Sequence, residues 1–428
     1  MPIWPGSDTP ALERAASAHA SEVGKAPLAT AAAPATWSLL GEHVDHVGGV
    51  VLMSLSTQRV GVALSFRGDD TVHVQHHHRS ARGEQLTDAD AVSLSEVAKR
   101  ATQQQPGVDE SGKLMAPPVP TGGLAARLGG ILWTMIHRQL LSRDTPGCDV
   151  TIVNDIPGEA GLGALASTDT AFALALHHTT GEADDAPART RLAEVCSQSA
   201  AIFSRYPTLR ARHTAALRGA ASTVSVIDYA DGSVTQAPHP VTRETRAFAV
   251  FAPEPAQRQD FTEEIRARQS FISRAERTFG VDSIRLLPDA PERVAEWLAA
   301  VHSVHGPEGV PGLSEARTWL SFYAAETQRA QQLASVLRSR RHGDAWLLLK
   351  TSQTALSHSY GLHGVDSALA KLCLERGALA ARSAAAGTST AVIVVVPDDK
   401  ETNFVADLSA DGLQIVPLET GEPAGTEQ

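Results

Sequence analysis

A short polar segment between two apolar strand patterns constrains this chain more than any other stretch does. It runs from Pro34 to Val51 and reads PATWSLLGEHVDHVGGVV. Glu42, His43 and Asp45 place two carboxylates and an imidazole within four residues, and apolar runs precede and follow them. Charged groups between buried strands must be paired or must bind a ligand, because leaving them unsatisfied away from water is costly. The segment therefore predicts a loop that either binds something or holds its own polar network.

The composition is that of a globular chain with a moderate negative charge. At 428 residues the chain is longer than one ordinary core requires, so two domains are expected. The net charge of -11 argues against nonspecific binding to nucleic acid or to a membrane surface. The N-terminus lacks a basic-then-apolar leader, and no apolar run approaches the ~20 residues of a membrane span. We therefore expect a cytoplasmic protein.

Hydrophobic periodicity predicts a chain of mixed helices and strands. Strands are predicted at residues 50–55, 60–66, 71–75, 148–154, 223–228, 245–251 and 391–397. Helices are predicted at residues 11–23, 123–142, 187–206, 208–218, 263–279, 290–302, 315–338 and 344–360. A Gln-, Pro- and Gly-rich stretch, 101–121, predicts a loop, and the polar last ten residues are expected to fray. The strand 245–251 and the turn after it predict a domain boundary, which gives domains 1–245 and 246–428.

Neither cysteines nor histidines give a metal signature along the sequence. Cys148, Cys196 and Cys373 are scattered and odd in number, which argues against a disulfide framework and a zinc site. The run His76-His77-His78 follows a strand pattern, and we expect it to lie in a solvated hairpin turn. No acidic or cysteine partner stands at ligand spacing from it, so the sequence predicts no metal there.

A glycine-containing segment, Ile156–Ser167, follows the strand 148–154 and opens an apolar helix. It reads IPGEAGLGALAS. Backbone N–H groups and the dipole at such a helix start attract an anion. The segment is a candidate nucleotide loop, whose residues are Gly161, Leu162, Gly163, Ala164, Leu165 and Ser167.

These two segments resemble motifs of one known family. GEHVDHVGG resembles the galactokinase signature GEHTDYNGG of the GHMP kinase superfamily, and the Ile156–Ser167 segment resembles the family's PxGAGLSSSAS. The resemblance implies an α+β, two-domain GHMP-kinase fold, with a ribosomal-protein-S5-like N-terminal domain and a ferredoxin-like, helix-rich C-terminal domain. It also implies that the first segment holds sugar hydroxyls, with Glu42, His43, Asp45 and Gly48 as the substrate-binding residues. Glu326 and Arg329 resemble a Glu and an Arg late in a helix of the family.

The same resemblance indicates that the residues of phosphoryl transfer are missing. The family's Asp in GIMDQFAS falls on Arg212, and its Arg in PGRVNLIGEH falls on Thr36. No Asp or Glu lies between Glu194 and Asp228, and a guanidinium cannot accept a proton. The metal-binding Ser and Glu of the family fall on Ala164 and Ala200. We therefore expect that no catalytic residue and no metal ligand is retained.

The favoured hypothesis is a non-catalytic galactokinase-like protein that binds a sugar-like small molecule or a protein partner, with no cofactor. Glu42 and Asp45 would either hold hydroxyls or hold the loop through backbone hydrogen bonds. The sugar-pocket Tyr of the family falls near Ile265, which puts galactose specificity in question. We expect Arg212 to form a salt bridge with Glu42 or Asp45, or to point into solvent.

Two alternatives stay open. In the first alternative, the chain is an active ATP-dependent galactokinase or other sugar kinase with rearranged catalytic residues that uses Mg-ATP. Asp169 is then the acid nearest to a phosphate. Otherwise the helix start at the nucleotide loop binds an anion or a nucleotide by itself, without magnesium.

Overall fold

The computed structural model describes residues 4–105, 107–108, 114–115, 117–207, 209–254 and 260–426. Its strands are β1 (Ala29–Leu40), β2 (Val50–Phe66), β3 (Thr71–Arg79), β4 (Gln85–Ser93), β5 (Gly107–Val108), β6 (Leu114–Met115), β7 (Cys148–Asn154), β8 (Thr223–Asp228), β9 (Ser233–Pro238), β10 (Thr245–Phe251), β11 (Ala380–Ser383), β12 (Val392–Pro397) and β13 (Gln414–Pro417). Its α-helices are α1 (Ala11–Val23), α2 (Leu94–Gln103), α3 (Leu124–His137), α4 (Ala164–His178), α5 (Ala186–Phe203), α6 (Arg210–Arg218), α7 (Thr262–Phe279), α8 (Ala290–His305), α9 (Leu313–Arg338), α10 (His342–His358), α11 (Val365–Glu375) and α12 (Glu401–Ala410). Short 3₁₀ turns lie at η1 (Asp45–Val47), η2 (Gly158–Ala160), η3 (Ile284–Leu286) and η4 (Asp398–Lys400).

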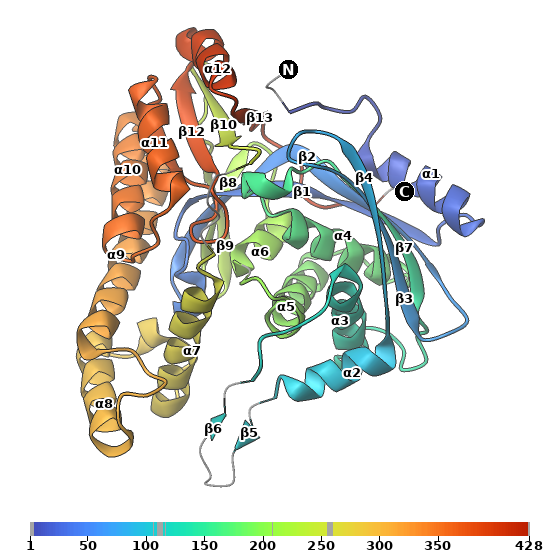
Figure 1. The fold of residues 1–428 in the computed structure, drawn as a ribbon, viewed down its shortest axis with the longest axis horizontal. Helices are drawn as coiled ribbons and strands as arrows, with labels where there is room; N and C mark the ends of the chain where they lie inside the picture. Colours follow the sequence, from blue (N-terminus) through green and yellow to red (C-terminus); the bar gives the residue numbers. More distant parts are fainter. Residues whose placement is uncertain are drawn as a thin grey trace.

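Two β-sheets with helices packed on them form most of the molecule (Figure 1). The larger sheet has the order β4-β3-β7-β2-β8-β9, and β1 pairs with β2. The smaller sheet has the order β11-β12-β10-β13. Numbered along the chain this is 2-3-1-4, the strand order of a ferredoxin-like sheet, and the helices α7 to α11 are inserted between its first two strands.

The long strand β2 organises the larger sheet. It is one strand of 17 residues where the sequence predicted two, because the polar stretch 56–59 continues the strand instead of forming a turn. It pairs with β1, with β7 through residues 60–66 and with β8 through residues 50–54. A Cβ on Gly61 would lie 2.4 Å from the carbonyl oxygen of Ala11, so only a glycine lets α1 lie this close to the strand. The sheet and α1 are thereby held together at the N-terminal end of the helix.

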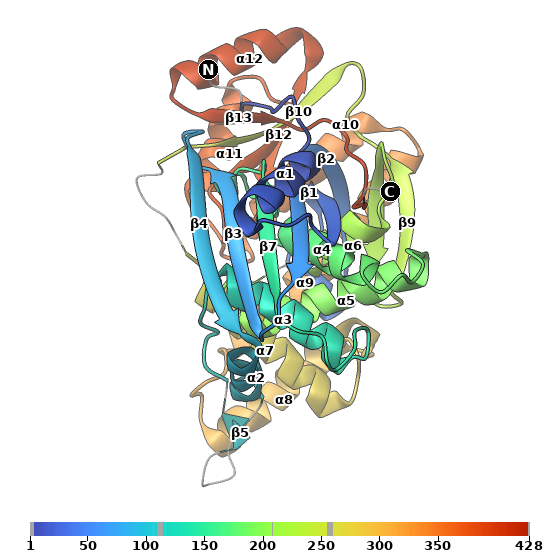
Figure 2. The same ribbon diagram turned by 90° about the vertical axis from the view of Figure 1, so that its right-hand side faces the viewer.

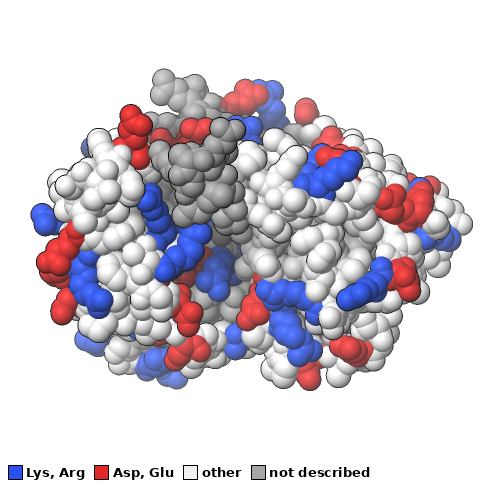
Figure 3. Space-filling model, turned by 90° about the horizontal axis from the view of Figure 1, so that it is seen from below, with Lys and Arg blue, Asp and Glu red and all other residues white. Residues whose placement is uncertain are grey.

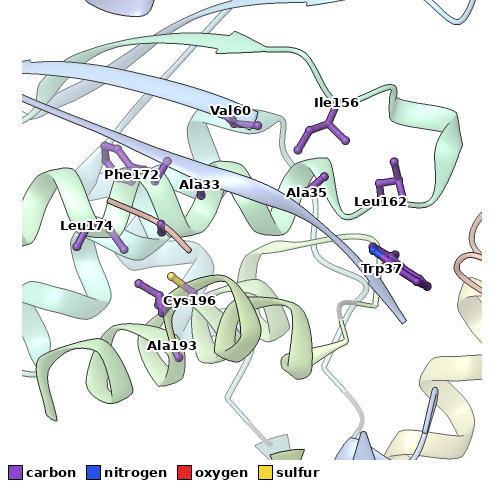
Figure 4. Close-up of a cluster of buried hydrophobic side chains, with 14 of the residues drawn as sticks. Ala33, Ala35, Trp37, Val60, Ile156, Leu162, Phe172, Leu174, Ala193 and Cys196 are labelled. Atoms are coloured by element: carbon purple, nitrogen blue, oxygen red, sulfur yellow. The ribbon is translucent and has the colours of Figure 1, made fainter. Parts of the chain in front are cut away.

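Helices cover both faces of the larger sheet (Figure 2). On one face α1 packs Ala15 against Ala63 and Val153. On the other face α4 and α5 contribute Phe172 and Cys196 to a buried cluster shared with β1 (Figure 4). Helix α4 is buried over most of its surface, which explains why its sequence is apolar nearly all round. This buried helix begins at the nucleotide loop and fixes that loop against the sheet.

Both ends of the chain cross between the two sheets. The backbone N–H of Trp4 donates to the carbonyl oxygen of Ile415 at 2.8 Å. Ala32 and Gly425 exchange both backbone hydrogen bonds, at 2.8 and 2.9 Å. The predicted fraying of the last ten residues is therefore wrong for the described part of that segment.

Several further elements were not predicted from the sequence. β4 and β9 are mostly exposed and lack an apolar alternation, whereas β11 and β13 have only four residues each. His76, His77 and His78 lie within β3 and not in the predicted turn, because β3 continues to Arg79 and pairs with β4 along that whole length. The predicted loop 101–121 overlaps the end of α2, and residues 106, 109–113 and 116 of it lie outside the described residues.

The surface agrees with the mixed charge of the sequence. On the face seen in Figure 3, basic and acidic side chains are interspersed among uncharged ones. In the described part of the chain, no helix combines the length and the apolar character needed to cross a lipid bilayer.

Candidate functional site

The polar loop predicted from the sequence connects β1 to β2 and is almost completely buried. Gly41 has φ 89°, and a Cβ there would lie 2.1 Å from the carbonyl oxygen of Val50, so the turn requires glycine. His43 also has a positive φ, 63°, which is uncommon for a residue with a side chain. The loop therefore holds a conformation that its surroundings must stabilise, and those surroundings come from the second half of the chain.

Glu42 is bound by one group of β11 and one group of the segment that follows it. Its Oε1 accepts a hydrogen bond from the backbone N–H of Ala386 at 2.8 Å, and its Oε2 accepts one from Nη1 of Arg382 at 3.0 Å. Arg382 is 1% exposed and Glu42 is 4% exposed. A buried charge is tolerated when it is paired in this way. Both oxygens of the predicted sugar-binding acid thus have partners within the protein.

A second buried acid extends this network. Glu326 accepts hydrogen bonds from the backbone N–H of Gly41 at 3.1 Å and from Oγ of Ser352 at 2.7 Å. Its other oxygen, Oε2, accepts from Nε of Arg329 at 2.8 Å, and Nη2 of Arg382 lies 3.7 Å from Oε1. The loop is therefore tied to α9, α10 and β11 through paired charges.

His43 is held as a neutral ring. Its Nε2 lies 2.9 Å from the carbonyl oxygen of Ala386, which fixes the proton on Nε2, and its ring packs against Tyr360 with centroids 5.4 Å apart. Burial lowers the pKa of His43 below its usual value. The ring therefore fastens the loop to the segment after β11 and carries no charge near neutral pH.

Among the described residues, Asp45 accepts a hydrogen bond at one of its two oxygens. Its Oδ2 accepts a hydrogen bond from the backbone N–H of Arg210, at the start of α6, at 2.8 Å. Its Oδ1 lies 3.7 Å from Nδ1 of His46, and both ring nitrogens of His46 are buried without a hydrogen-bond partner among the described residues. Burial acts to raise the pKa of Asp45, but the neighbouring His46 and Arg210 outweigh it and the pKa is lowered. Asp45 and His46 thus form the least satisfied polar pair of the loop.

Arg212 lies where the loops of the site converge. Its Nη1 donates to the carbonyl oxygen of Thr36 at 2.6 Å and its Nη2 to the carbonyl oxygens of Gly161 at 2.8 Å and Ala384 at 3.1 Å. The residue is 5% exposed, and it has no carboxylate within salt-bridge distance among the described residues. Burial lowers the pKa of Arg212, while the charge of Glu42 opposes that shift.

The expected position of Arg212 is therefore wrong. Neither a salt bridge to one of the loop acids nor exposure to solvent is observed, because three backbone carbonyls take up its N–H groups. The carbonyls belong to β1, the nucleotide loop and the segment after β11, and Arg212 joins these three parts of the chain.

The nucleotide loop packs closely against this guanidinium. Gly163 has φ 75°, and a Cβ there would lie 2.8 Å from Cδ of Arg212 and 2.9 Å from Oγ1 of Thr36. Oγ of Ser167 donates to the carbonyl oxygen of Pro34 at 2.7 Å, so that hydroxyl serves the contact with β1. Leu165 is 41% exposed at the first turn of α4. The loop presents backbone and apolar groups, and its adjoining space is filled by Arg212.

Two positions considered for metal binding are buried and unsuited to it. Asp169 is 0% exposed and forms a two-point ion pair with Nε and Nη2 of Arg127, at 2.6 and 2.5 Å. His213 also lies 2.9 Å from the same carboxylate. Burial acts to raise the pKa of Asp169, but Arg127 and His213 outweigh it and the pKa is lowered. Ala200 lies buried on α5 and offers only a methyl group.

The predicted site residues thus meet in one region. The structure brings Thr36, Glu42, Gly161, Gly163 and Arg212 together, and the segment after β11 joins them. Ile265, also 1% exposed, belongs to a separate buried cluster with Val44 and Val47 of the loop. Two cavities of about 530 and 260 Å³ lie elsewhere, at the chain termini and beside the β3–β4 hairpin.

Arg382 and His46 were missed in the sequence. Arg382 is the single charged residue in a run of small residues, AARSAAAG. A charge buried with such a run requires a partner, and this was the available signal. His46 stands where the family signature has Tyr, and nothing in the sequence showed that its ring would be unsatisfied.

Sequence comparison relates this chain to galactokinases. The galactose-binding signature of galactokinases matches residues 17–66. The galactokinase of Mycobacterium bovis (strain BCG / Pasteur 1173P2) is 26% identical over 380 residues, which cover 88% of this chain and 90% of that protein. The galactokinase of Streptomyces coelicolor is 25% identical over 404 residues and 91% of each chain.

Solved structures show the same fold. Lactococcus lactis galactokinase complexed with galactose superposes with a TM-score of 0.70 at 16% identity, covering 97% of this chain and 99% of that one. Methanococcus jannaschii mevalonate kinase gives a TM-score of 0.56 at 11% identity, covering 92% and 98%. The two-domain α+β GHMP-kinase fold is confirmed, and the sequence of the chain is similar to those of galactokinases.

Proposed function

We propose that this protein is a non-catalytic member of the galactokinase family that binds a sugar-like ligand. The observation that carries the proposal is the position of Arg212. Its guanidinium occupies the space between Thr36, Gly161 and Ala384, and a guanidinium stays protonated in proteins and cannot serve as a base. A proton acceptor for a sugar hydroxyl is therefore missing where the resemblance expects one.

The phosphate side of the site supports the same proposal. Magnesium prefers carboxylate and hydroxyl oxygens, and the positions expected to supply them are Ala164 and Ala200. Asp169, the acid considered for the active alternative, is committed to Arg127 and His213. Each lost charge-stabilising group typically costs about 3 kcal/mol in the transition state, so the combined losses leave little phosphoryl transfer.

The proposed sugar-like ligand would contact the loop between β1 and β2. Both ring nitrogens of His46 are buried without a partner among the described residues, and a hydroxyl that contacts His46 and Asp45 would donate to the carboxylate and accept from the ring. The matched galactose-binding signature and the galactose complex of the L. lactis enzyme favour a sugar as the source of that hydroxyl. Glu42 keeps a structural role, since both its oxygens are taken.

A thermal-shift series tests the proposal. Galactose and related sugars, ATP with magnesium and ATP with chelator are added separately, since a ligand that binds only the folded state raises the melting temperature. We expect a shift with at least one sugar that His46→Leu abolishes, and none with ATP. If no sugar raises the melting temperature, the proposed sugar-like ligand is wrong. If ATP raises it in a magnesium-dependent way, the proposed loss of the nucleotide site is wrong.

The active-kinase alternative keeps one observation in its favour. The two relatives compared above, which match this chain over about 90% of their own length, are named galactokinases. A direct turnover assay separates the two functions.

A further inference from the structure

A cluster of metal-ligating side chains lies on the β3–β4 hairpin, outside the site described above. His76 and His78 are two residues apart on β3 and so point to the same face of the sheet. Asp88 of β4 is the direct antiparallel partner of His76. One ligand atom from each of these three residues lies within 4.8 Å of the others.

We propose that His76, His78 and Asp88 bind a divalent transition-metal ion of the zinc class. Two imidazoles and one carboxylate form a donor set that zinc takes at sites whose remaining positions hold water. The two rings are already stacked, with centroids 4.5 Å apart and planes at 10°, and Nε2 of His78 lies 2.8 Å from Oδ2 of Asp88. Side-chain rotation would have to direct the three donor atoms at one point.

The unpaired nitrogen of His76 is the observation that a simple ion pair leaves unexplained. Its Nε2 is buried and has no hydrogen-bond partner among the described residues. The contact of His78 with Asp88 needs no third group, so pairing alone does not account for a second imidazole beside them.

The backbone gives this cluster a fixed base. β3 pairs with β4 over nine residues and with β7 on its other side, where His76 is aligned with Ile152. β4 is the outermost strand of the sheet and is largely exposed. A metal ion bound by His76, His78 and Asp88 would therefore fasten this edge strand to its neighbour.

His77 supplies a matched control. It is the residue between the two proposed ligands and faces the opposite side of the strand, where its Nε2 lies 2.9 Å from Glu22 of α1. The three cysteines are buried and would not compete for added metal.

The test uses the full-length, tag-free protein and zinc chloride in isothermal titration calorimetry. We expect one zinc ion per chain, with binding weakened at least tenfold by His76→Gln, His78→Gln or Asp88→Asn and unchanged by His77→Gln. Zinc should raise the melting temperature of the native protein and of His77→Gln, but not that of the His76→Gln/His78→Gln double variant. Melting without metal shows that each variant is folded.

A cobalt titration provides an independent readout. The visible absorption of bound cobalt should develop fully with the native protein and only weakly with Asp88→Asn. It should be lost in the His76→Gln/His78→Gln double variant. If the double variant binds zinc as tightly as the native protein, or if His77→Gln weakens binding as much as His78→Gln does, the proposed site is wrong.

Discussion

Arg212 and Thr36 are 176 residues apart in the sequence, and Nη1 of Arg212 donates to both the carbonyl oxygen and Oγ1 of Thr36, at 2.6 and 3.2 Å. The resemblance to galactokinases puts an Asp at position 212 and an Arg at position 36. Here the cation stands on α6 and a small neutral residue faces it. An arginine at position 36 would bring a second cation next to Arg212, so the two departures from the family pattern fit one another.

Removing this guanidinium should destabilise the fold. Arg212→Leu leaves three buried carbonyl oxygens without their donor, and each unsatisfied group costs about 1–3 kcal/mol. We expect the free energy of unfolding to fall by about 3 kcal/mol or more, measured by urea denaturation. Arg218→Leu, on the same helix but with a single exposed hydrogen bond, should change it by less than about 0.5 kcal/mol. Equal effects of the two variants would show that Arg212 does not join the loops.

Gly163 reports how closely the nucleotide loop packs on Arg212. Gly163→Ala adds a methyl group 2.8 Å from Cδ of Arg212 at a positive φ, whereas Gly181→Ala places one at nearly the same φ with no atom within 4 Å. The second change should cost about 1–2 kcal/mol for backbone strain, and the first should cost about 1–3 kcal/mol more because of the overlap. Thermal unfolding of the two variants makes the comparison. Equal losses would mean that the loop is free to move away from the arginine.

The pair formed by Glu42 and Arg382 should behave as a buried ion pair. Arg382→Met and Glu42→Gln each remove one partner, and we expect each to lower the free energy of unfolding by about 3–5 kcal/mol. The double variant should lose less than the sum, since no charge is then left unpaired. The exposed pair Arg376–Asp411 is the control, with an expected coupling of at most about 1 kcal/mol. Additive losses at the buried pair would contradict the interaction.

His239 should make stability depend on pH in the acid range. Burial lowers its pKa to about 4 from 6.5, so the unfolded chain takes up a proton that the folded chain does not. The contribution of His239 to the free energy of unfolding is fully present above pH 6.5. It is lost as the pH falls from 6.5 towards 4, by at most about 3 kcal/mol.

Urea denaturation between pH 7 and pH 4 measures this dependence. His239→Gln should reduce its slope by about one proton, while the exposed His178→Gln should leave it unchanged. An unchanged slope in His239→Gln would show that the ring is protonated in the folded protein.

Local patterns in the sequence predicted much of the fold. The helix 11–23 and the strands 223–228 and 245–251 have the predicted bounds, because their periodicity is set by which face is buried. The segments Pro34–Val51 and Ile156–Ser167 also fall in one region, as the family motifs implied.

The contacts that complete the site could not be read from the sequence. Arg382 reaches Glu42 across 340 residues, and Arg212 binds carbonyl oxygens, which every residue has and no sequence marks. Asp88 stands opposite His76 only because of the register of a hairpin whose second strand lacks an apolar pattern. Long-range pairing and register depend on the assembled fold, so residue types alone predict them poorly.

We propose that this galactokinase-like chain does not transfer phosphate to galactose. The most direct measurement is the formation of galactose phosphate by the purified full-length protein with galactose and Mg-ATP, with an active galactokinase as the positive control. We predict no product above the protein-free background, for the native chain and for Arg212→Asp alike, since Thr36, Ala164 and Ala200 remain unchanged. Turnover by the native protein that is abolished by Glu42→Gln or Asp45→Asn would contradict this account.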